Sequence, residues 1–158
     1  MTAITKISLA GQSYKKLETI AILNQTANSA SVYKAVEVPR WARRATMVVS
    51  GLTMTGTSPL FDFILYGANV AVTQPPDDGA LYDLGGWDGI TQKTAATATT
   101  TVIDIGPEVT ADDTGSATAS DRYGIQAALP AWLVYKYTTD GTTDDEDYDA
   151  VISVYFFP

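Results

Sequence analysis

Apolar and polar residues alternate with a period of two along most of the 158 residues. This alternation is typical of β-strands that bury one face, and no stretch shows the 3.6-residue period of an amphipathic helix convincingly. We therefore expect an all-β fold. The predicted strands cover residues 4–9, 12–23, 32–38, 45–54, 60–66, 94–105, 132–139 and 148–156, with a less regular element at 123–129.

Clusters of turn-forming residues separate these strands, for example at 55–59 and 112–116. Short strands at this spacing indicate a single antiparallel β-sandwich domain over residues 1–158, with about eight or nine strands. A jelly-roll-like strand order is favoured over an immunoglobulin-like one. The last two strands are interpreted as a hairpin closed by the acidic residues at 140–147. Residues 73–93 predict a long irregular loop, and a loop of that length usually has a function or lies at an interface.

The strand at 60–66 is apolar on both faces. Phe61, Phe63 and Leu65 point one way, and the opposite face is apolar apart from Asp62. A strand of this kind lies either in the centre of a sandwich or at an interface with another chain.

The chain has no cysteine and no histidine. Disulfides and thiolate chemistry are therefore excluded, and so are Ser-His-Asp triads and imidazole metal sites. The N-terminal residues lack the apolar stretch of a signal peptide. The apolar runs fall far short of the ~20 residues that cross a bilayer. We expect a soluble chain without a membrane partner.

Catalysis without histidine or cysteine would fall to carboxylates, lysine, tyrosine or hydroxyls. A glycoside hydrolase needs two carboxylates facing across a cleft. Asp62 on its apolar strand is the best single candidate, and Asp83 or Asp88 would have to supply its partner. Nothing in the sequence places a second carboxylate opposite Asp62. We therefore expect no catalytic residues, no cofactor and no enzymatic activity.

The acidic residues at 144–149 offer oxygen ligands of the kind that Ca²⁺ prefers. They lack the spacing of the known D-x-[DN]-x-[DN]-G calcium loop. An acidic strand connection that stays in solvent and discourages edge-to-edge aggregation is the preferred interpretation. No metal site is expected.

The net charge of −8 is unevenly spread along the chain, with +5 on residues 1–50 and −13 on residues 51–158. Opposite charges at the two ends of a chain can attract a neighbour, or a second copy, head to tail. The alternative is that the acidic residues simply lie in solvated loops.

The most concentrated positive charge lies at 38–45, where Arg40, Arg43 and Arg44 surround Trp41. Arginine forks match phosphate oxygens and tryptophan can stack on a base. Nucleic-acid-binding domains are usually basic, however, and three arginines in a chain of net charge −8 do not make a basic domain. Trp and Arg are enriched at hot spots of protein interfaces, so we expect these four residues to bind a protein partner and no nucleic acid. The alternative is a set of ordinary exposed arginines before a strand.

Trp87 lies among Gly85, Gly86 and Gly89 in the expected loop. A tryptophan in such a loop can serve as a stacking platform for a sugar, or it can fill the core or a neighbouring subunit. Trp87 is therefore a fifth candidate for partner binding.

Two stretches of the chain resemble structural proteins of tailed bacteriophages, in particular the capsid decoration (cement) proteins. The first stretch begins with a Val-Pro step and a basic strand start at 38–45. An apolar strand that runs to 57 follows, and then the Leu-Tyr-Gly sequence at 65–67. The second is the stretch at 129–135 together with the final strand at 151–156. The long segment at 73–93 departs from the pattern of that family.

The resemblance implies a virion component without enzymatic activity, made in the host cytoplasm and built into the particle. Its expected role is to bridge and stabilise neighbouring major-capsid subunits. The expected partners are the major capsid protein and further copies of the chain itself, in a homotrimer. The alternative is a β-domain of a tail or fibre that binds carbohydrate or a receptor through Trp87 and the 73–93 loop.

Overall fold

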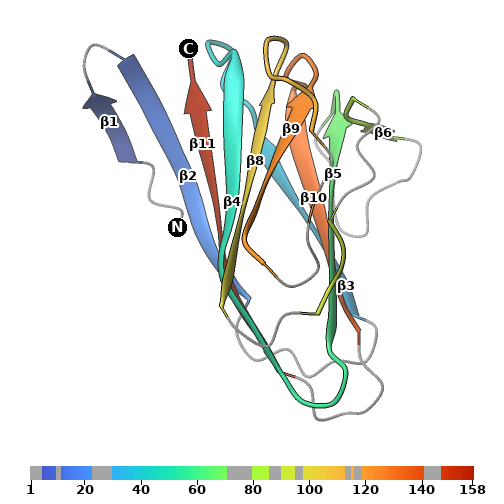
Figure 1. Cartoon of the computed structure of the whole chain (residues 1–158). Coiled ribbons are helices and arrows are strands. Elements are labelled where there is room, and N and C mark those ends of the chain that lie inside the picture. Colours follow the sequence, from blue (N-terminus) through green and yellow to red (C-terminus); the bar gives the residue numbers. More distant parts are fainter. Residues whose placement is uncertain are drawn as a thin grey trace.

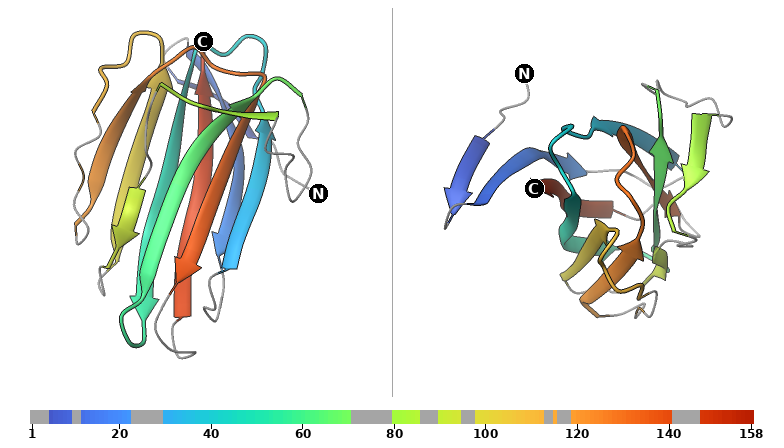
Figure 2. Two further views of the ribbon diagram at one scale, coloured as in Figure 1. Left: turned by 90° about the vertical axis from the view of Figure 1, so that its right-hand side faces the viewer. Right: turned by 90° about the horizontal axis from the view of Figure 1, so that it is seen from above.

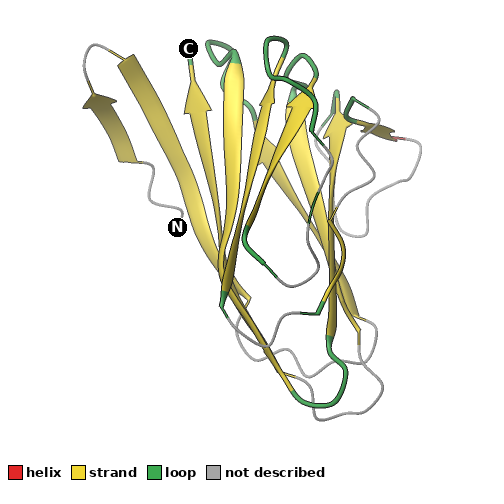
Figure 3. Cartoon of the chain, viewed as in Figure 1, coloured by secondary structure: helices red, strands yellow, loops and turns green. Residues whose placement is uncertain are grey.

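The computed structural model of this protein describes residues 5–9, 12–22, 30–70, 80–85, 90–94, 98–112, 115, 119–140 and 147–158. The regular elements of these residues are eleven β-strands (Figure 3). They are β1 (Thr5–Leu9), β2 (Gln12–Ile22), β3 (Ala30–Glu37), β4 (Arg44–Thr55), β5 (Leu60–Ala68), β6 (Leu81–Asp83), β7 (Ile90–Lys93), β8 (Thr99–Gly106), β9 (Asp121–Gln126), β10 (Trp132–Asp140) and β11 (Asp147–Phe157).

The all-β prediction is confirmed, and each of the nine predicted elements corresponds to a strand. Two further strands, β6 and β7, lie inside the segment at 73–93 that we expected to be irregular throughout. Both pair with β5. The physical reason is that the N–H and C=O groups of β5 that point away from β10 need partners, and these short strands supply some of them.

Two sheets face each other (Figures 1 and 2). Sheet A has the strand order β1-β2-β11-β4-β8-β9. Sheet B has the order β3-β10-β5-β6, with β7 also paired to β5. The chain changes sheet at each connection between β2 and β5. The last two strands then return to inner positions, where β10 lies between β3 and β5 and β11 lies between β2 and β4.

The predicted hairpin of the last two strands is wrong. β10 pairs with β3 and β5 in sheet B, whereas β11 pairs with β2 and β4 in sheet A. Two apolar strands joined by a polar loop can lie side by side or across a sandwich, and their alternation is the same in both arrangements. Here they lie in different sheets, because each has two other partners.

One strand pair departs from the antiparallel prediction. β8 and β9 run parallel, with Ile103 beside Tyr123 and Ile105 beside Ile125. β9 begins with Asp121 beside Thr101, near the start of β8. Part of the connection between β8 and β9 lies along β9, where Asp112 and Gly124 exchange two backbone hydrogen bonds of 3.0 Å. β9, one of the two edge strands of sheet A, therefore has a backbone partner at Gly124, which this connection supplies.

A β-bulge at Gly51 reverses the alternation within β4. One additional residue shifts the register with β8 between Val49 and Leu52. Gly51 itself has φ 64°, in the left-handed region that glycine adopts without a steric cost. The bulge keeps the apolar residues on the inner face along the whole strand. The buried residues of β4 are Ala45, Met47, Val49, Leu52 and Met54.

The core lies between the sheets and both contribute to it. In sheet B, Phe61 and Phe63 of β5 stack with Tyr137 and Tyr135 of β10, at centroid distances of 6.2 and 5.7 Å. β5 lies between β10 and the pair β6 and β7, with Phe61, Phe63 and Leu65 buried in the core. Its second face, with Leu60, Ile64 and Tyr66, lies on the outer side of sheet B and is half-buried. Sheet A contributes Met47, Val49, Leu52, Ile103, Ile105, Ile152, Val154 and Phe156.

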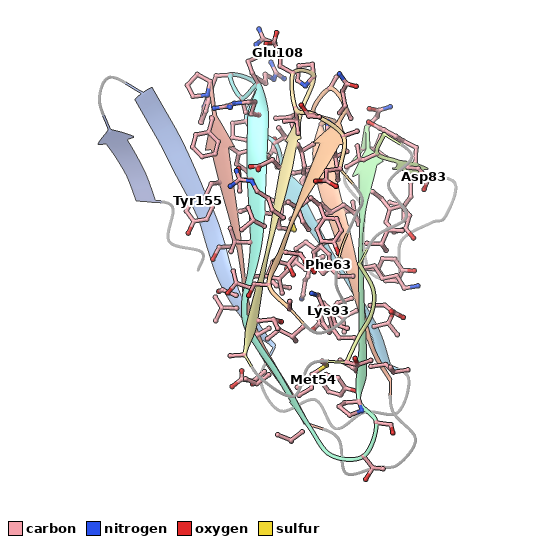
Figure 4. The ribbon with its side chains drawn as sticks, viewed as in Figure 1. Met54, Phe63, Asp83, Lys93, Glu108 and Tyr155 are labelled. Atoms are coloured by element: carbon pink, nitrogen blue, oxygen red, sulfur yellow. The ribbon has the colours of Figure 1, made fainter. Side chains whose placement is uncertain are left out.

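A buried ion pair joins the two sheets along one side of the sandwich. Nζ of Lys93, in β7, donates to Oδ2 of Asp121 in β9 at 2.6 Å and also to the carbonyl oxygen of Ala119. The Lys93 side chain is 1% exposed and that of Asp121 is 12% exposed. Figure 4 shows Lys93 in the space between the sheets. The pair therefore ties an edge of sheet B to an edge of sheet A.

Asp121→Asn should destabilise the protein by about 3–5 kcal/mol, because it leaves the buried ammonium of Lys93 without its counter-charge. Arg122→Gln breaks the exposed pair of Arg122 with Asp104 and should cost no more than about 1 kcal/mol. Urea denaturation followed by circular dichroism measures both. A cost below about 1 kcal/mol for Asp121→Asn would contradict the role given to the ion pair.

Stability should fall in alkali because two buried phenols resist ionisation. Burial raises the pKa of Tyr137 above its ordinary value of 10.0. The pKa of Tyr123 is raised by burial first, and then by the charges of Asp121 and Asp112. A phenol with a raised folded-state pKa adds stability below its unfolded pKa, and loses it as pH rises through the folded pKa. The unfolding free energy should therefore drop above about pH 10.

Tyr137→Phe should make this alkaline drop smaller, since it removes one buried phenol. Tyr82→Phe is the matched control, because Tyr82 is 41% exposed. Urea midpoints between about pH 8 and pH 11 measure the effect, with the absorbance of tyrosinate as a second signal. An equal drop in Tyr137→Phe and the unmodified protein would refute the assignment.

Candidate functional site

One end of the sandwich brings together segments that are far apart in the sequence, and the C-terminus lies there (Figure 1). β4 begins opposite the end of β11, with Arg44 beside Phe157. β10 begins opposite the end of β5, with Trp132 beside Ala68. β8 and β9 both finish there. We call this end, formed by residues 38–44, 68–70, 81–82, 106–110, 126–132 and 157–158, the end face.

Residues 38–44, which we call the arginine–tryptophan segment, connect β3 in sheet B to β4 in sheet A. Three backbone hydrogen bonds hold it. Val38 N donates to Ala131 O at 2.9 Å, Ala42 N donates to Pro39 O at 2.9 Å, and Arg43 N donates to Phe157 O at 2.8 Å. The apolar side chains of Val38 and Ala42 are buried. The segment is therefore fixed to both sheets.

The polar side chains of this segment point outward as a consequence. Arg40, Arg43 and Arg44 are exposed, and Trp41 is 44% exposed. The other large apolar residues with comparable exposure in the described ranges are Val70 at 59% and Tyr82 at 41%. Both also belong to the end face. Neither residue could be predicted as part of this surface, because Val70 follows a strand end and Tyr82 lies in a strand of three residues.

The three arginines have no carboxylate within 4.0 Å among the residues that the structure describes, where the ion pairs found are Lys93–Asp121 and Arg122–Asp104. The guanidinium of Arg44 lies over the ring of Phe157, 5.6 Å from its centroid. Two exposed carboxylates, Glu37 and Glu108, lie at the same end (Figure 4 labels Glu108). Together with the adjacent Glu37, the end face thus presents three guanidiniums, two carboxylates and three large apolar side chains to solvent.

The acidic part of the chain begins at the opposite end. β10 finishes at Asp140 and β11 starts at Asp147, and eleven residues of β11 separate that end from the end face. At about 3.3 Å per residue, this is a distance of about 35 Å. The acidic residues at 141–146, with the expected calcium-binding or solvated loop, lie outside the described residues.

The carboxylates considered for glycoside hydrolysis are not brought together. Asp83 of β6 is paired with Tyr66 of β5, four residues along the strand from Asp62. Their backbones are therefore about 13 Å apart along the strand direction. This exceeds the ~5–9.5 Å between the catalytic carboxyl groups of most glycoside hydrolases. Asp88 and Trp87 both lie outside the described residues.

Neither a metal cluster nor a membrane span is found in the part of the chain that the structure describes. No group of three or more Asp and Glu side chains there is arranged to hold a metal ion. No helical segment there has the length and apolar character for a membrane crossing.

Comparison with known proteins adds no relative. No protein-family model matches the chain, and no curated protein matches it.

The exposed arginines of the arginine–tryptophan segment should be dispensable for folding. Arg40→Ser and Arg43→Ser should each change the unfolding free energy by no more than about 0.5 kcal/mol. Ala42→Asp should cost more than about 3 kcal/mol, because it buries an unpaired charge. Urea denaturation measures all three. A loss above about 1 kcal/mol in Arg40→Ser or Arg43→Ser would assign that side chain to the fold rather than to a partner.

Proposed function

We propose that this protein is a non-enzymatic structural component of a tailed-phage virion, a capsid decoration protein that bridges and stabilises major-capsid subunits. It would be made in the host cytoplasm and built into the particle, without a nucleic-acid or membrane partner. The observation that carries the proposal is the composition of the end face, where Arg40, Trp41, Arg43 and Arg44 are exposed on a segment anchored to both sheets.

The chemistry of the end face suits a protein partner with an acidic surface. Tryptophan, tyrosine and arginine are the residues most enriched at binding hot spots, and Trp41, Tyr82 and the arginines supply all three types. The backbone hydrogen bonds of the segment lower the entropy that is lost when it binds. A guanidinium without a carboxylate of its own can form charge-assisted pairs with one from the partner.

A second copy of the chain is also a suitable partner. Asp140 and Asp147, which flank the acidic residues 141–146 in the sequence, are strand ends at the end of the sandwich opposite the arginines. Head-to-tail contacts between such ends are heterologous, so they close into a ring when the rotation between copies allows it. The expected homotrimer would be the smallest ring of this kind.

The order of the strands supports the jelly-roll assignment. Leaving aside β1, β7 and β9, four strands remain in each sheet, in the orders β2-β11-β4-β8 and β3-β10-β5-β6. In both sheets a strand from the end of the chain lies between two strands from its first half. Two nested Greek keys, which define an eight-stranded jelly roll, give this interleaving.

The second candidate is a β-domain of a tail or fibre that binds carbohydrate. Trp87, which suggested this function, lies outside the described residues. The observation that now favours it is a polar hollow on the outer face of sheet A, lined in part by Asp104 and Arg122.

The proposed role is tested on the phage particle. The chain should co-purify with capsids in hundreds of copies, whereas a handful of copies would indicate a tail. Arg40→Ser, Arg43→Ser and Arg44→Ser combined should lower its occupancy on purified capsids about tenfold or more, because several charge-assisted contacts are lost. Absence of the chain from particles would reject the virion assignment.

Lys136→Ser is the control for this experiment, because Lys136 lies on sheet B away from the end face, with its ammonium over the ring of Tyr33. Its occupancy should equal that of the unmodified protein. Unchanged occupancy in the triple variant would remove the arginines from the mechanism. Sedimentation of the free protein at low and high salt tests the trimer separately.

A further inference from the structure

The outer face of sheet A carries a hollow of about 360 Å³ next to the end face. It crosses four neighbouring strands, β11, β4, β8 and β9, and ends at the turn that follows β8. Its polar and aromatic lining consists of Arg44, Thr46, Asp104, Glu108, Arg122 and Phe157.

Two glycines allow one wall of this hollow to lie directly on the sheet. A Cβ atom on Gly124 would lie 2.0 Å from the carbonyl oxygen of Thr110, and one on Gly106 would lie 2.9 Å from Cγ of Arg44. Because Gly124 has no side chain, the backbone at Thr110 can pack directly on the backbone of β9. The two hydrogen bonds between Asp112 and Gly124 hold this turn in place. The hollow is a fixed feature of the fold.

The polar groups on its floor are held in place by one another. Asp104 accepts a hydrogen bond from Oγ1 of Thr46 at 2.7 Å and another from Nε of Arg122 at 2.7 Å. A second nitrogen of Arg122, Nη2, lies 2.6 Å from the same carboxylate. The Asp104 side chain is 21% exposed and that of Arg122 is 73% exposed. Asp104 and Thr46 are therefore the preorganised part of the hollow, which a ligand does not have to order when it binds.

These groups keep hydrogen-bonding capacity for a ligand. A guanidinium has five N–H donors, and Arg122 donates one hydrogen bond to Asp104, from Nε. The guanidinium of Arg44 has no ion pair in the described part of the chain and lies over the ring of Phe157, 5.6 Å from its centroid. The carboxylates of Asp104 and Glu108 and the oxygen of Thr46 supply acceptors. Two guanidiniums and two carboxylates make the hollow neutral as a whole.

We propose that this hollow binds one neutral sugar unit of a glycan. A sugar hydroxyl both donates and accepts hydrogen bonds, so a ring of hydroxyls matches a surface of interspersed arginines and carboxylates. An anionic ligand would be repelled by the two carboxylates, and a cationic ligand would be repelled by the two arginines. The volume of about 360 Å³ lies at the small end of the ~300–1,000 Å³ of small-molecule sites, which suits a single sugar ring.

The proposal deepens the second candidate function and names its site. Arg44, Glu108 and Phe157 belong to both the hollow and the end face, whereas Asp104 lines the hollow alone. Asp104→Asn therefore tests sugar binding on the free protein without changing the end face. Arg40→Ser and Arg43→Ser change the end face without changing the hollow, so each proposal can fail while the other holds.

The test is a titration of the ¹⁵N-labelled protein with glucose, galactose, mannose and N-acetylglucosamine, followed by NMR, with glucuronate and acetate as charged comparators. At least one neutral sugar should shift the amide signals of Thr46, Asp104 and Glu108, with a Kd of about 1 mM. Asp104→Asn should weaken that binding about tenfold, since it removes a charged acceptor. Glu108→Gln, at the exposed rim, should weaken it without disturbing the Asp104 network.

Asp149→Asn is the matched control, because Asp149 is an exposed carboxylate of β11 that does not line the hollow. It should bind the sugar as the unmodified protein does. The proposal is overturned if no neutral sugar shifts these signals, or if only glucuronate or acetate does. Equal affinity in Asp104→Asn, Glu108→Gln and the unmodified protein would overturn it as well.

Discussion

The burial of one face of each sheet against the other is the interaction on which the rest of this structure depends. The chain has no cysteine, so no disulfide assists it. The stacked rings of β5 and β10 pack in one core cluster with the aliphatic residues of β4, β8 and β11. The Lys93–Asp121 pair adds a polar link where the sheet edges meet. The end face and the outer hollow both depend on this packing, since each is built from the ends or outer faces of packed strands.

The alternation of apolar residues was enough to predict the strands but not their partners. A strand that buries one face has the same pattern whether its neighbour lies beside it or across the sandwich. This is why β10 and β11 were expected to form a hairpin, and why the parallel pair of β8 and β9 was not foreseen. β6 and β7 have three and four residues, too few to establish a period.

The exposed part of the end face was more predictable than the hollow. Pro39 ends β3, and the apolar neighbours Val38 and Ala42 are buried, so Arg40, Trp41 and Arg43 face solvent. These determinants lie within a few residues of each other. The hollow instead combines Arg44, Asp104 and Arg122, which meet because β4, β8 and β9 are adjacent in sheet A. Without that strand order, nothing in the sequence connects them.

The position of β11 also sets the order in which the chain can fold during its synthesis. β11 follows the other ten strands in the sequence, yet it pairs with both β2 and β4. Until it is synthesised, the facing edges of β2 and β4 have no partner, and sheet A stays divided into two parts. Pairings between distant segments form slowly, and unpaired strand edges favour aggregation meanwhile. Sheet A can therefore close only after residues 147–157 have been made.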